Sequence, residues 1–438
     1  MVSLSKAYFY LYLLLVLSLF FAPALFTSLD ELALLLMFML GAVDVLYNRD
    51  WKKYKTLFVA GGVLFFYYVY SLGFCHYNIF KAITMDFWTH LKPVIAFSVA
   101  YAIAPEFTAK QRFIIKSVIV IMAIAGVIVF YSPYFHDMLF HVYYFGNIYI
   151  GGAIIWLMLM ANDSERNHKN DIVCVLMLIL LGLQCTRSKY YGIAVVFLFM
   201  LLMYKPKIIA HISFKNMLLI LLLICGVIFV AWEKISFYFV AGGAGVLEDA
   251  MATVDDVESL GMMMARPAMY YFSILVFADH LWLGSGLASF ASYCSSPDYN
   301  YSALYHEYGI NKIWGLSEEY PAFIADTFYP ELAQFGLVGI LTLVACVLWF
   351  CKRLKLVHRL YGIIPFVAGL LVLVSLGIDA VASTGPVNSI GENLFAVLGM
   401  ILAKVKYIDN KRADEALKSP LADGLTVWRK VGLKTKRY

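Results

Sequence analysis

Two arginines and their surroundings are suited to binding an anion. Arg266 precedes Pro267, a residue favoured at the first position of a helix, so its guanidinium would lie beside free backbone N–H groups. Pairing with the acidic residues between 248 and 258 is the alternative explanation for Arg266. Arg187 and Lys189 share a short turn between two apolar runs, where Arg187 would be fixed at the rim of the membrane or would simply extend to the water interface.

Asp326 and His306 are the candidate general bases. Tyr320 and Pro321 indicate a helix start, and Pro330, four residues after Asp326, has no N–H to bind the carbonyl of Asp326. A carboxylate beside a free carbonyl suits a group that accepts a proton or a hydroxyl hydrogen bond, although a solvated Asp at a kinked helix entry has the same pattern. His306 is the second candidate; the alternative is that it is only a surface residue, as most single histidines in loops are.

Aromatic residues are dense around His306. They could form the floor of a site for sugar rings, or an aromatic belt at the membrane interface. The candidates for sugar binding are Tyr305, Tyr308, Trp314 and Tyr329.

The elements that must position these residues are membrane helices. The 438 residues are 62% hydrophobic and 14% charged, with mean hydropathy +0.78, whereas a soluble domain is about 25% charged. We expect an all-α polytopic membrane protein with about 12 transmembrane helices, since a span needs roughly 20 apolar residues. The expected spans are 8–27, 31–47, 56–75, 89–104, 113–132, 142–162, 171–186, 189–204, 216–232, 331–351, 360–379 and 388–404.

This pattern divides the chain into four parts: spans at 1–232, a long polar loop with short helices at 233–330, the last three spans at 331–404, and a basic tail at 405–438. Most of the 34 basic residues fall in alternate connections, which predicts cytoplasmic termini and an outer position for the long loop. The same bias accounts for the net charge of +5, so we expect a lipid bilayer and no nucleic acid as partner.

Ionisable residues within the spans are expected to cluster near the outer ends, which suggests a polar cavity open to the outside rather than a path across the membrane. They include Lys92, Glu331, Asp379 and Glu392. No Cys or His cluster has metal-ligand spacing, so no metal is expected. No pair of matching, Gly- or Pro-interrupted spans is found, which disfavours a transporter.

Several stretches resemble the O-antigen ligase and polymerase superfamily, and they lie mainly between residues 186 and 340. They are Thr186-Arg187-Ser188, Arg266, the run from Asp279 to Phe290, the run from Asp326 to Gly339, and more weakly Ser383-Thr384-Gly385-Pro386 with Ile390-Gly391. The resemblance implies a GT-C-like, inverting glycosyltransferase that needs no metal, cofactor or nucleotide sugar. It also implies a bacterial inner-membrane location, with the active site facing the periplasm.

The donor implied by the resemblance is a glycan on undecaprenyl diphosphate, with Arg187, Arg266 and the neighbouring Lys189 holding the diphosphate. Asp326 is then the first choice of base and His306 the second. Ligases of this superfamily commonly have a His near the start of the motif at the tenth span, where this chain reads Ala325-Asp326, and this departure favours a repeat-unit polymerase for O antigen, capsule or exopolysaccharide. A ligase acting on lipid A-core is the alternative, a flippase without chemistry the third hypothesis, and a chain-length regulator a further candidate partner.

Overall fold

The computed structural model describes residues 3–24, 26, 28–132, 145–161, 169–183, 192–194, 265–381, 383–406 and 408. Regular structure within these residues is helical, with no strand among them. The α-helices are α1 (Leu4–Ala24), α2 (Leu29–Asn48), α3 (Lys55–Phe74), α4 (Phe80–Ile103), α5 (Ala109–Tyr131), α7 (Gly146–Met160), α8 (Lys169–Leu183), α14 (Ala265–Asp279), α15 (Ala303–Glu307), α16 (Phe328–Glu331), α17 (Gly336–Tyr361), α18 (Ile363–Asp379) and α19 (Ser389–Ala403). Short 3₁₀ segments are η1 (Trp51–Tyr54), η4 (Tyr293–Ser295), η5 (Ile310–Lys312), η6 (Leu332–Phe335) and η7 (Gly385–Val387).

The predicted spans coincide with these helices wherever the structure describes them. The spans expected at 189–204 and 216–232 lie almost wholly outside the described residues, so the total of about 12 stays a prediction. Helix α17 ends ten residues after the expected end at 351, and α4 begins nine residues before the expected Thr89. The added first turns of α4 carry Lys81 and Asp86, whose polarity hid them from a hydropathy window.

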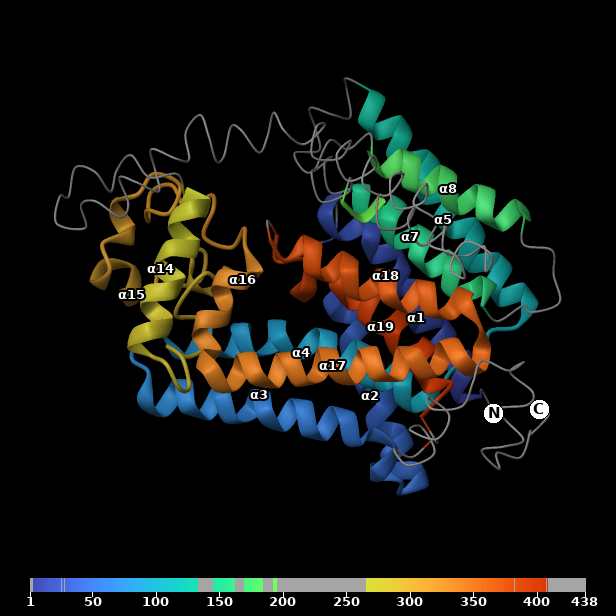
Figure 1. Cartoon of the computed structure of the whole chain (residues 1–438), viewed down its shortest axis with the longest axis horizontal. Helices are drawn as coiled ribbons and strands as arrows, with labels where there is room; N and C mark the ends of the chain where they lie inside the picture. The colour runs from blue at the N-terminus through green and yellow to red at the C-terminus, as the bar shows by residue number, and fades with distance from the viewer. Residues whose placement is uncertain are drawn as a thin grey trace, which may run out of the picture.

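Helix α4 and helix α19 pack closely at the centre of the bundle (Figure 1). Gly399 makes this approach possible, because a Cβ there would lie 2.4 Å from the carbonyl oxygen of Phe97. The N-terminus of α19 is capped by the side chain of Asn388, which accepts from the N–H groups of Ile390 and Gly391 at 3.1 and 3.4 Å. The two helices therefore form a fixed axis around which the other helices pack.

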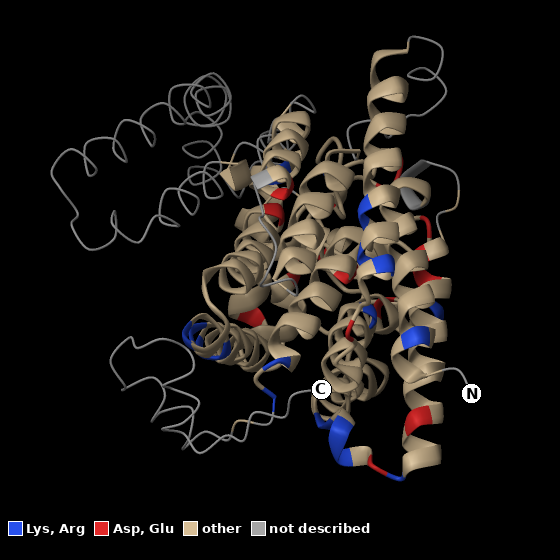
Figure 2. Ribbon diagram, turned by 90° about the vertical axis from the view of Figure 1, so that its right-hand side faces the viewer, with Lys and Arg blue, Asp and Glu red and all other residues tan. Residues whose placement is uncertain are grey.

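One end of the bundle brings together the connections that the sequence predicts on one side of the membrane. Ser5 donates to the carbonyl of Glu106, Lys406 to that of Ala102, and Tyr361 to that of Lys404. Figure 2 views the bundle from this side, with lysine and arginine segments and acidic ones interspersed across it. The three bonds bring the start of α1, the connection from α4 to α5 and the ends of α17 and α19 together.

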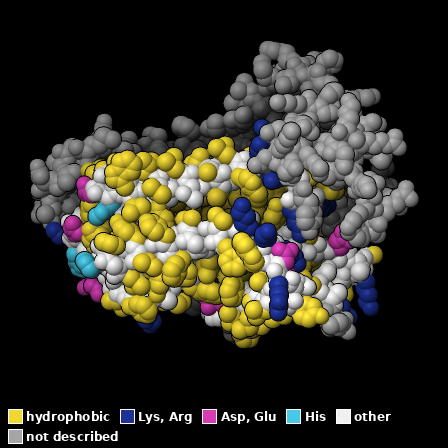
Figure 3. Space-filling view, turned by 90° about the horizontal axis from the view of Figure 1, so that it is seen from below, with side chains coloured by type: hydrophobic (Ala, Val, Ile, Leu, Met, Phe, Trp, Pro, Cys, Tyr) yellow, Lys and Arg dark blue, Asp and Glu magenta, His cyan; other side chains and the backbone are white. Residues whose placement is uncertain are grey.

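The outer faces of several helices are apolar and suited to lipid. Four stretches within the described residues are long and apolar enough to cross a membrane: Leu4–Phe21, Trp51–Phe74, Ala109–Tyr131 and Phe328–Tyr361. Hydrophobic side chains cover much of the face in Figure 3, with acidic and histidine side chains at its left edge and most lysine and arginine side chains from its middle to its right. An apolar surface of this size is stable in lipid and not in water, so the chain is a helical membrane protein.

The described part of the long loop, from residue 265 on, forms a small unit at the opposite end of the bundle, around α14, α15 and α16 (Figure 1). Its core is built from buried apolar residues such as Met269, Phe272, Ile313 and Ile324. The unit is tied to the bundle at α18, because the N–H groups of Phe328 and Tyr329 both bind the carbonyl of Ala380.

Candidate functional site

Arg266 and Asp326, which the sequence suggests for anion binding and proton acceptance, contact each other directly. Arg266 lies near the start of α14, and its Nε donates to Oδ2 of Asp326 at 2.6 Å. A second N–H, on Nη2, donates to the same oxygen. The ring of Phe323 lies 5.4 Å from the guanidinium carbon and adds a cation–π contact. Arg266 is 25% exposed and Asp326 20%, so each keeps a face open to solvent.

Turns position Phe323 and Asp326. The N–H of Phe323 binds the carbonyl of Gly315 at 2.9 Å, and the N–H of Asp326 reaches the carbonyl of Phe323 at 3.4 Å. Gly315 has a φ of +87°, and a Cβ there would lie 2.6 Å from the Phe323 ring. Glycine at 315 is therefore a condition for placing the ring beneath Arg266.

The expected helix start at Tyr320 and Pro321 is wrong. Residues 321–326 form turns, and helix resumes only at Phe328, the first residue of α16. Pro330 falls in the first turn of α16, where backbone N–H groups have no acceptor within the helix, so the missing N–H of proline breaks no hydrogen bond there. Proline is tolerated there, and Asp326 lies in the turn that precedes the helix.

The four aromatic candidates occupy different environments. Tyr305 is fully buried; its hydroxyl accepts from the N–H of Ala291 at 2.9 Å, and burial raises its pKa well above the usual value. This position supports the loop and does not favour contact with a sugar. Tyr308 donates to Asp279 and Tyr329 to the carbonyl of Gly377, while both keep part of their surface open. Trp314 is 66% exposed and is the candidate most accessible to a ligand.

Trp314 and His306 line a hollow of about 470 Å³ on the surface of the loop unit. Its other lining residues are polar or charged: Asn311, Lys312, Ser317, Glu318 and Glu319. The hollow adjoins the ion pair, because the ring of Trp314 lies 6.3 Å from that of Phe323, centroid to centroid. Asp326 is not among the lining residues, so the structure does not bring the two candidate bases to one place.

Arg187 and Lys189 lie outside the described residues. Their expected approach to Arg266 stays a prediction.

The stretch from Gly284 to Ala291, part of the motif that carries the family resemblance, is held by side chains from the bundle. Oδ2 of Asp86 accepts from the N–H of Ala288 at 2.6 Å, and Oε1 of Gln334 accepts from the N–H of Ser289 at 2.9 Å. Gly284, with φ of +75°, passes so close to η6 that a Cβ would lie 2.3 Å from the backbone of Gln334. This stretch is not helical, so its backbone N–H groups have no partners within a helix, and these side chains supply the missing hydrogen-bond acceptors.

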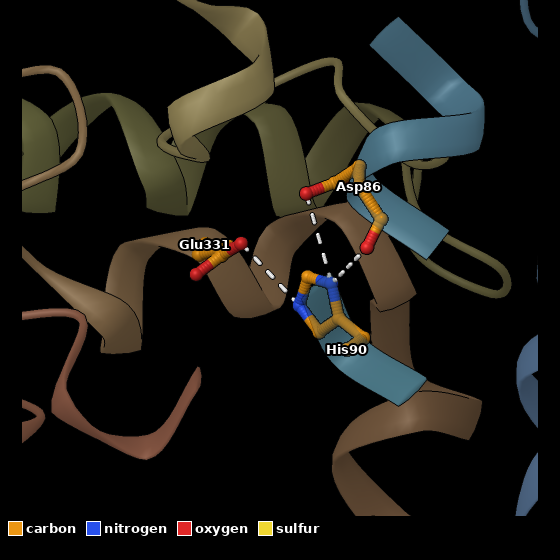
Figure 4. Close-up of side chains that lie close together, drawn as sticks. All are labelled: Asp86, His90 and Glu331. Atoms are coloured by element: carbon orange, nitrogen blue, oxygen red, sulfur yellow. Dashed lines mark hydrogen bonds and ion pairs between the residues drawn. The ribbon is translucent and has the colours of Figure 1, made fainter. Parts of the chain in front are cut away.

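A buried group of three titratable side chains lies behind this stretch, and sequence reasoning missed it. Nε2 of His90 lies 3.3 Å from Oε1 of Glu331, and its Nδ1 lies 3.6 Å from Oδ1 of Asp86 (Figure 4). All three residues are buried. The spacing of Asp86 and His90, four residues apart on one helix face, was the available signal, but their partner Glu331 is far away in sequence.

A second buried ionic group lies on another face of α4. Nζ of Lys92 is 3.1 Å from Oε1 of Glu392, 3.6 Å from Asp30 and 3.7 Å from Glu31. The sequence places Lys92 and Glu392 near the same ends of their spans, as found. Among the described residues, however, these two pair with each other in the interior and are buried, whereas an open cavity was expected.

Comparison with known protein families connects these features to a function. A family model described as O-antigen ligase matches residues 172–317, a segment that includes Arg266, the Gly284–Ala291 stretch and the lining of the hollow from His306 to Ser317. No curated protein matches the chain. The match confirms the superfamily resemblance noted in the sequence. The chain is therefore a helical membrane protein in which residues 172–317 match the O-antigen ligase family, and this match supports activity of the ligase and polymerase type in general.

Proposed function

We propose that this protein is a polysaccharide repeat-unit polymerase that acts at the outer face of the bacterial inner membrane. The donor is an undecaprenyl-diphosphate-linked glycan, and the acceptor is the terminal sugar of another lipid-linked unit. The observation that carries the proposal is the contact between Arg266 and Asp326 beside a mostly polar hollow that contains Trp314, in a unit at one end of the membrane bundle.

In the proposed reaction a hydroxyl of the acceptor sugar attacks the anomeric carbon of the donor. A new glycosidic bond forms, the bond between that carbon and the diphosphate oxygen breaks, and the configuration inverts. The hydroxyl proton passes to the carboxylate of Asp326, and undecaprenyl diphosphate leaves. The leaving group requires charge neutralisation, which fixed guanidinium donors supply well.

The donor diphosphate competes with Asp326 for Arg266. The resting ion pair is partly exposed, so its net contribution to stability is about 1 kcal/mol at most, and a diphosphate with more charge can displace the carboxylate. Arg187 and Lys189 would add further positive charge. Displacement frees Asp326 to accept a proton only once the donor is bound, which couples donor binding to activation of the acceptor.

Trp314 and the hollow beside it are the proposed position of sugar rings. An exposed indole supplies a flat apolar face for a sugar, and the polar side chains around it supply hydrogen bonds. His306, which lines the same hollow, contacts a sugar hydroxyl in this arrangement and is the alternative base.

The test is an assay with purified protein and a single undecaprenyl-diphosphate-linked repeat unit as sole substrate, read as a gel ladder. A ladder that is lost in Arg266→Ala supports the polymerase. Transfer only after lipid A-core is added makes the protein a ligase, the activity that gives the matching family its description. Uptake into vesicles without either product makes it a transporter. Either of these last results overturns the polymerase proposal.

A further inference from the structure

We propose that Asp86, His90 and Glu331 bind a divalent metal ion, zinc by preference, that fastens the loop unit to α4. One potential ligand atom of each residue lies within 4.8 Å of those of the other two. Asp86 and His90 come from α4 and Glu331 from α16, and both carboxylates face the imidazole, Asp86 on the side of Nδ1 and Glu331 on the side of Nε2 (Figure 4). This site goes beyond the proposed glycosyl transfer and does not depend on it.

The hydrogen bonds of His90 fix the tautomer that a metal ligand requires. Nδ1 lies 2.9 Å from the backbone carbonyl of Asp86, and a carbonyl can only accept, so Nδ1 carries the proton. In the neutral ring Nε2 then has a free lone pair, and it is the nitrogen that faces Glu331. A backbone carbonyl on the distal nitrogen is the usual way in which proteins orient a metal-binding histidine.

The contact between His90 and Glu331 has poor geometry for a direct hydrogen bond. Oε1 of Glu331 lies 3.3 Å from Nε2, yet Nε2 forms no hydrogen bond within the described part of the chain, so the oxygen lies to the side of the ring nitrogen's axis. Two donors on one tetrahedral ion at about 2.1 Å would lie about 3.4 Å apart. The observed separation of Nε2 and Oε1 fits two ligand atoms bound to the same metal ion better than it fits a hydrogen-bond donor and its acceptor.

The second carboxylate oxygen of Glu331 is also without a hydrogen-bond partner among the described residues. Glu331 is 1% exposed, and Oε2 is buried. Oε1 receives only a long hydrogen bond from Gln334, at 3.5 Å. A buried carboxylate of this kind is costly unless a cation compensates it.

Charge and ligand chemistry select the ion. Two carboxylates with a neutral imidazole carry two negative charges, which one divalent cation neutralises. Imidazole with two carboxylates suits zinc, manganese or iron, whereas calcium and magnesium prefer oxygen ligands alone. The ion would be structural: Asp86 also holds the N–H of Ala288, so the ion would join α4, α16 and the Gly284–Ala291 stretch.

Metal content of the full-length protein, purified in detergent through a tag without histidines, tests the proposal. We expect about one equivalent of zinc, manganese or iron per chain by mass spectrometry. A chelator should lower the melting temperature, and one equivalent of zinc should restore it. Protein that holds no stoichiometric metal, binds no added zinc or manganese and melts unchanged after chelation overturns the proposal and assigns the contact to a protonated imidazole.

Variants locate the ion. His90→Gln and Glu331→Gln should each lower the affinity for zinc at least tenfold and abolish the melting shift on reloading. His76→Gln, at an exposed histidine outside the group, should keep the metal and the shift. Equal metal content in all three variants would place any bound ion elsewhere and overturn the assignment. Chelation and reloading of the wild type decide the question even if a ligand variant fails to fold.

Discussion

The carboxylate of Asp326 accepts two hydrogen bonds from the guanidinium of Arg266, a residue 60 positions earlier in the chain. The two residues were suggested by separate features: Arg266 by its place before a proline, and Asp326 by its place before another. Their contact joins a potential phosphate ligand to a potential base. It also makes the two roles separable by substitution, because each side chain can be changed while the other stays.

Replacing Arg266 should remove most of the activity. Arg266→Ala is expected to lower kcat by about 100-fold or more, the usual cost of losing one preorganised donor to developing charge. Arg266→Lys keeps the charge without the planar fork and should recover only a small part. Arg112→Ala, at the opposite end of the bundle, is the control. Ladder formation at the wild-type rate in Arg266→Ala would rule out the diphosphate role.

Asp326→Asn should separate binding from catalysis. The amide has nearly the shape of the carboxylate but cannot take the hydroxyl proton, so kcat should fall about 100-fold or more. KM for the donor should stay the same or decrease, because no carboxylate competes for Arg266. Asp279→Asn, which alters another loop carboxylate, should change neither constant. A raised KM with unchanged kcat in Asp326→Asn would mean that Asp326 only positions Arg266.

Trp314→Ala should weaken sugar binding without removing catalysis. Loss of a stacked aromatic face costs about 1 kcal/mol, so KM should rise several-fold while kcat changes little. Trp314→Phe should lie close to the wild type. Trp282→Ala, at a similarly exposed indole outside the hollow, is the matched control. Equal kinetics for the two alanine variants would remove the hollow from the substrate path.

Gly284→Ala should destabilise the loop unit. The left-handed backbone and the overlap with Gln334 together cost about 3 kcal/mol or more. The melting temperature of the detergent-solubilised protein should therefore drop by several degrees. Gly62→Ala, on α3, is the control, because a Cβ there meets nothing within 4 Å. A melting temperature like that of the control would mean that the close approach to η6 can relax.

Lys92→Met should be strongly destabilising. It leaves Glu392 and Asp30 buried without their cation, a change that typically costs 3–5 kcal/mol, or roughly 10 °C in melting temperature for a chain of this size. The Lys92→Met/Glu392→Gln double variant should recover part of the loss, since one uncompensated carboxylate is gone. Lys81→Met, at an exposed lysine of the same helix, should melt near the wild type. Equal destabilisation by both single variants would show that charge at this end of α4, rather than the buried pair, sets stability.

The helical membrane architecture could be predicted from the sequence because lipid imposes a local rule. In lipid every backbone N–H and C=O group must be hydrogen-bonded within its own helix, so a transmembrane helix can be recognised in the sequence as about 20 apolar residues. By length and composition, the described stretches Leu4–Phe21, Trp51–Phe74, Ala109–Tyr131 and Phe328–Tyr361 follow that rule. The start of α4 does not follow it because Lys81 and Asp86 are polar, and Asp86 is tolerated where it accepts from the N–H of Ala288.

The loop unit depends on contacts that no local pattern encodes. Tyr305 and Trp314 belong to one aromatic stretch, but only packing decides that the first is buried under Ala291 and the second is exposed beside the hollow. Pro321 has the local signal of a helix start, yet the bond from Phe323 to the carbonyl of Gly315 holds the chain in turns. The sequence by itself determined that the chain is a helical membrane protein, and it supplied the candidates Arg266 and Asp326. Only the tertiary structure decided that these two touch and that Asp86, His90 and Glu331 converge, because such pairings depend on distances in space between segments far apart in the chain.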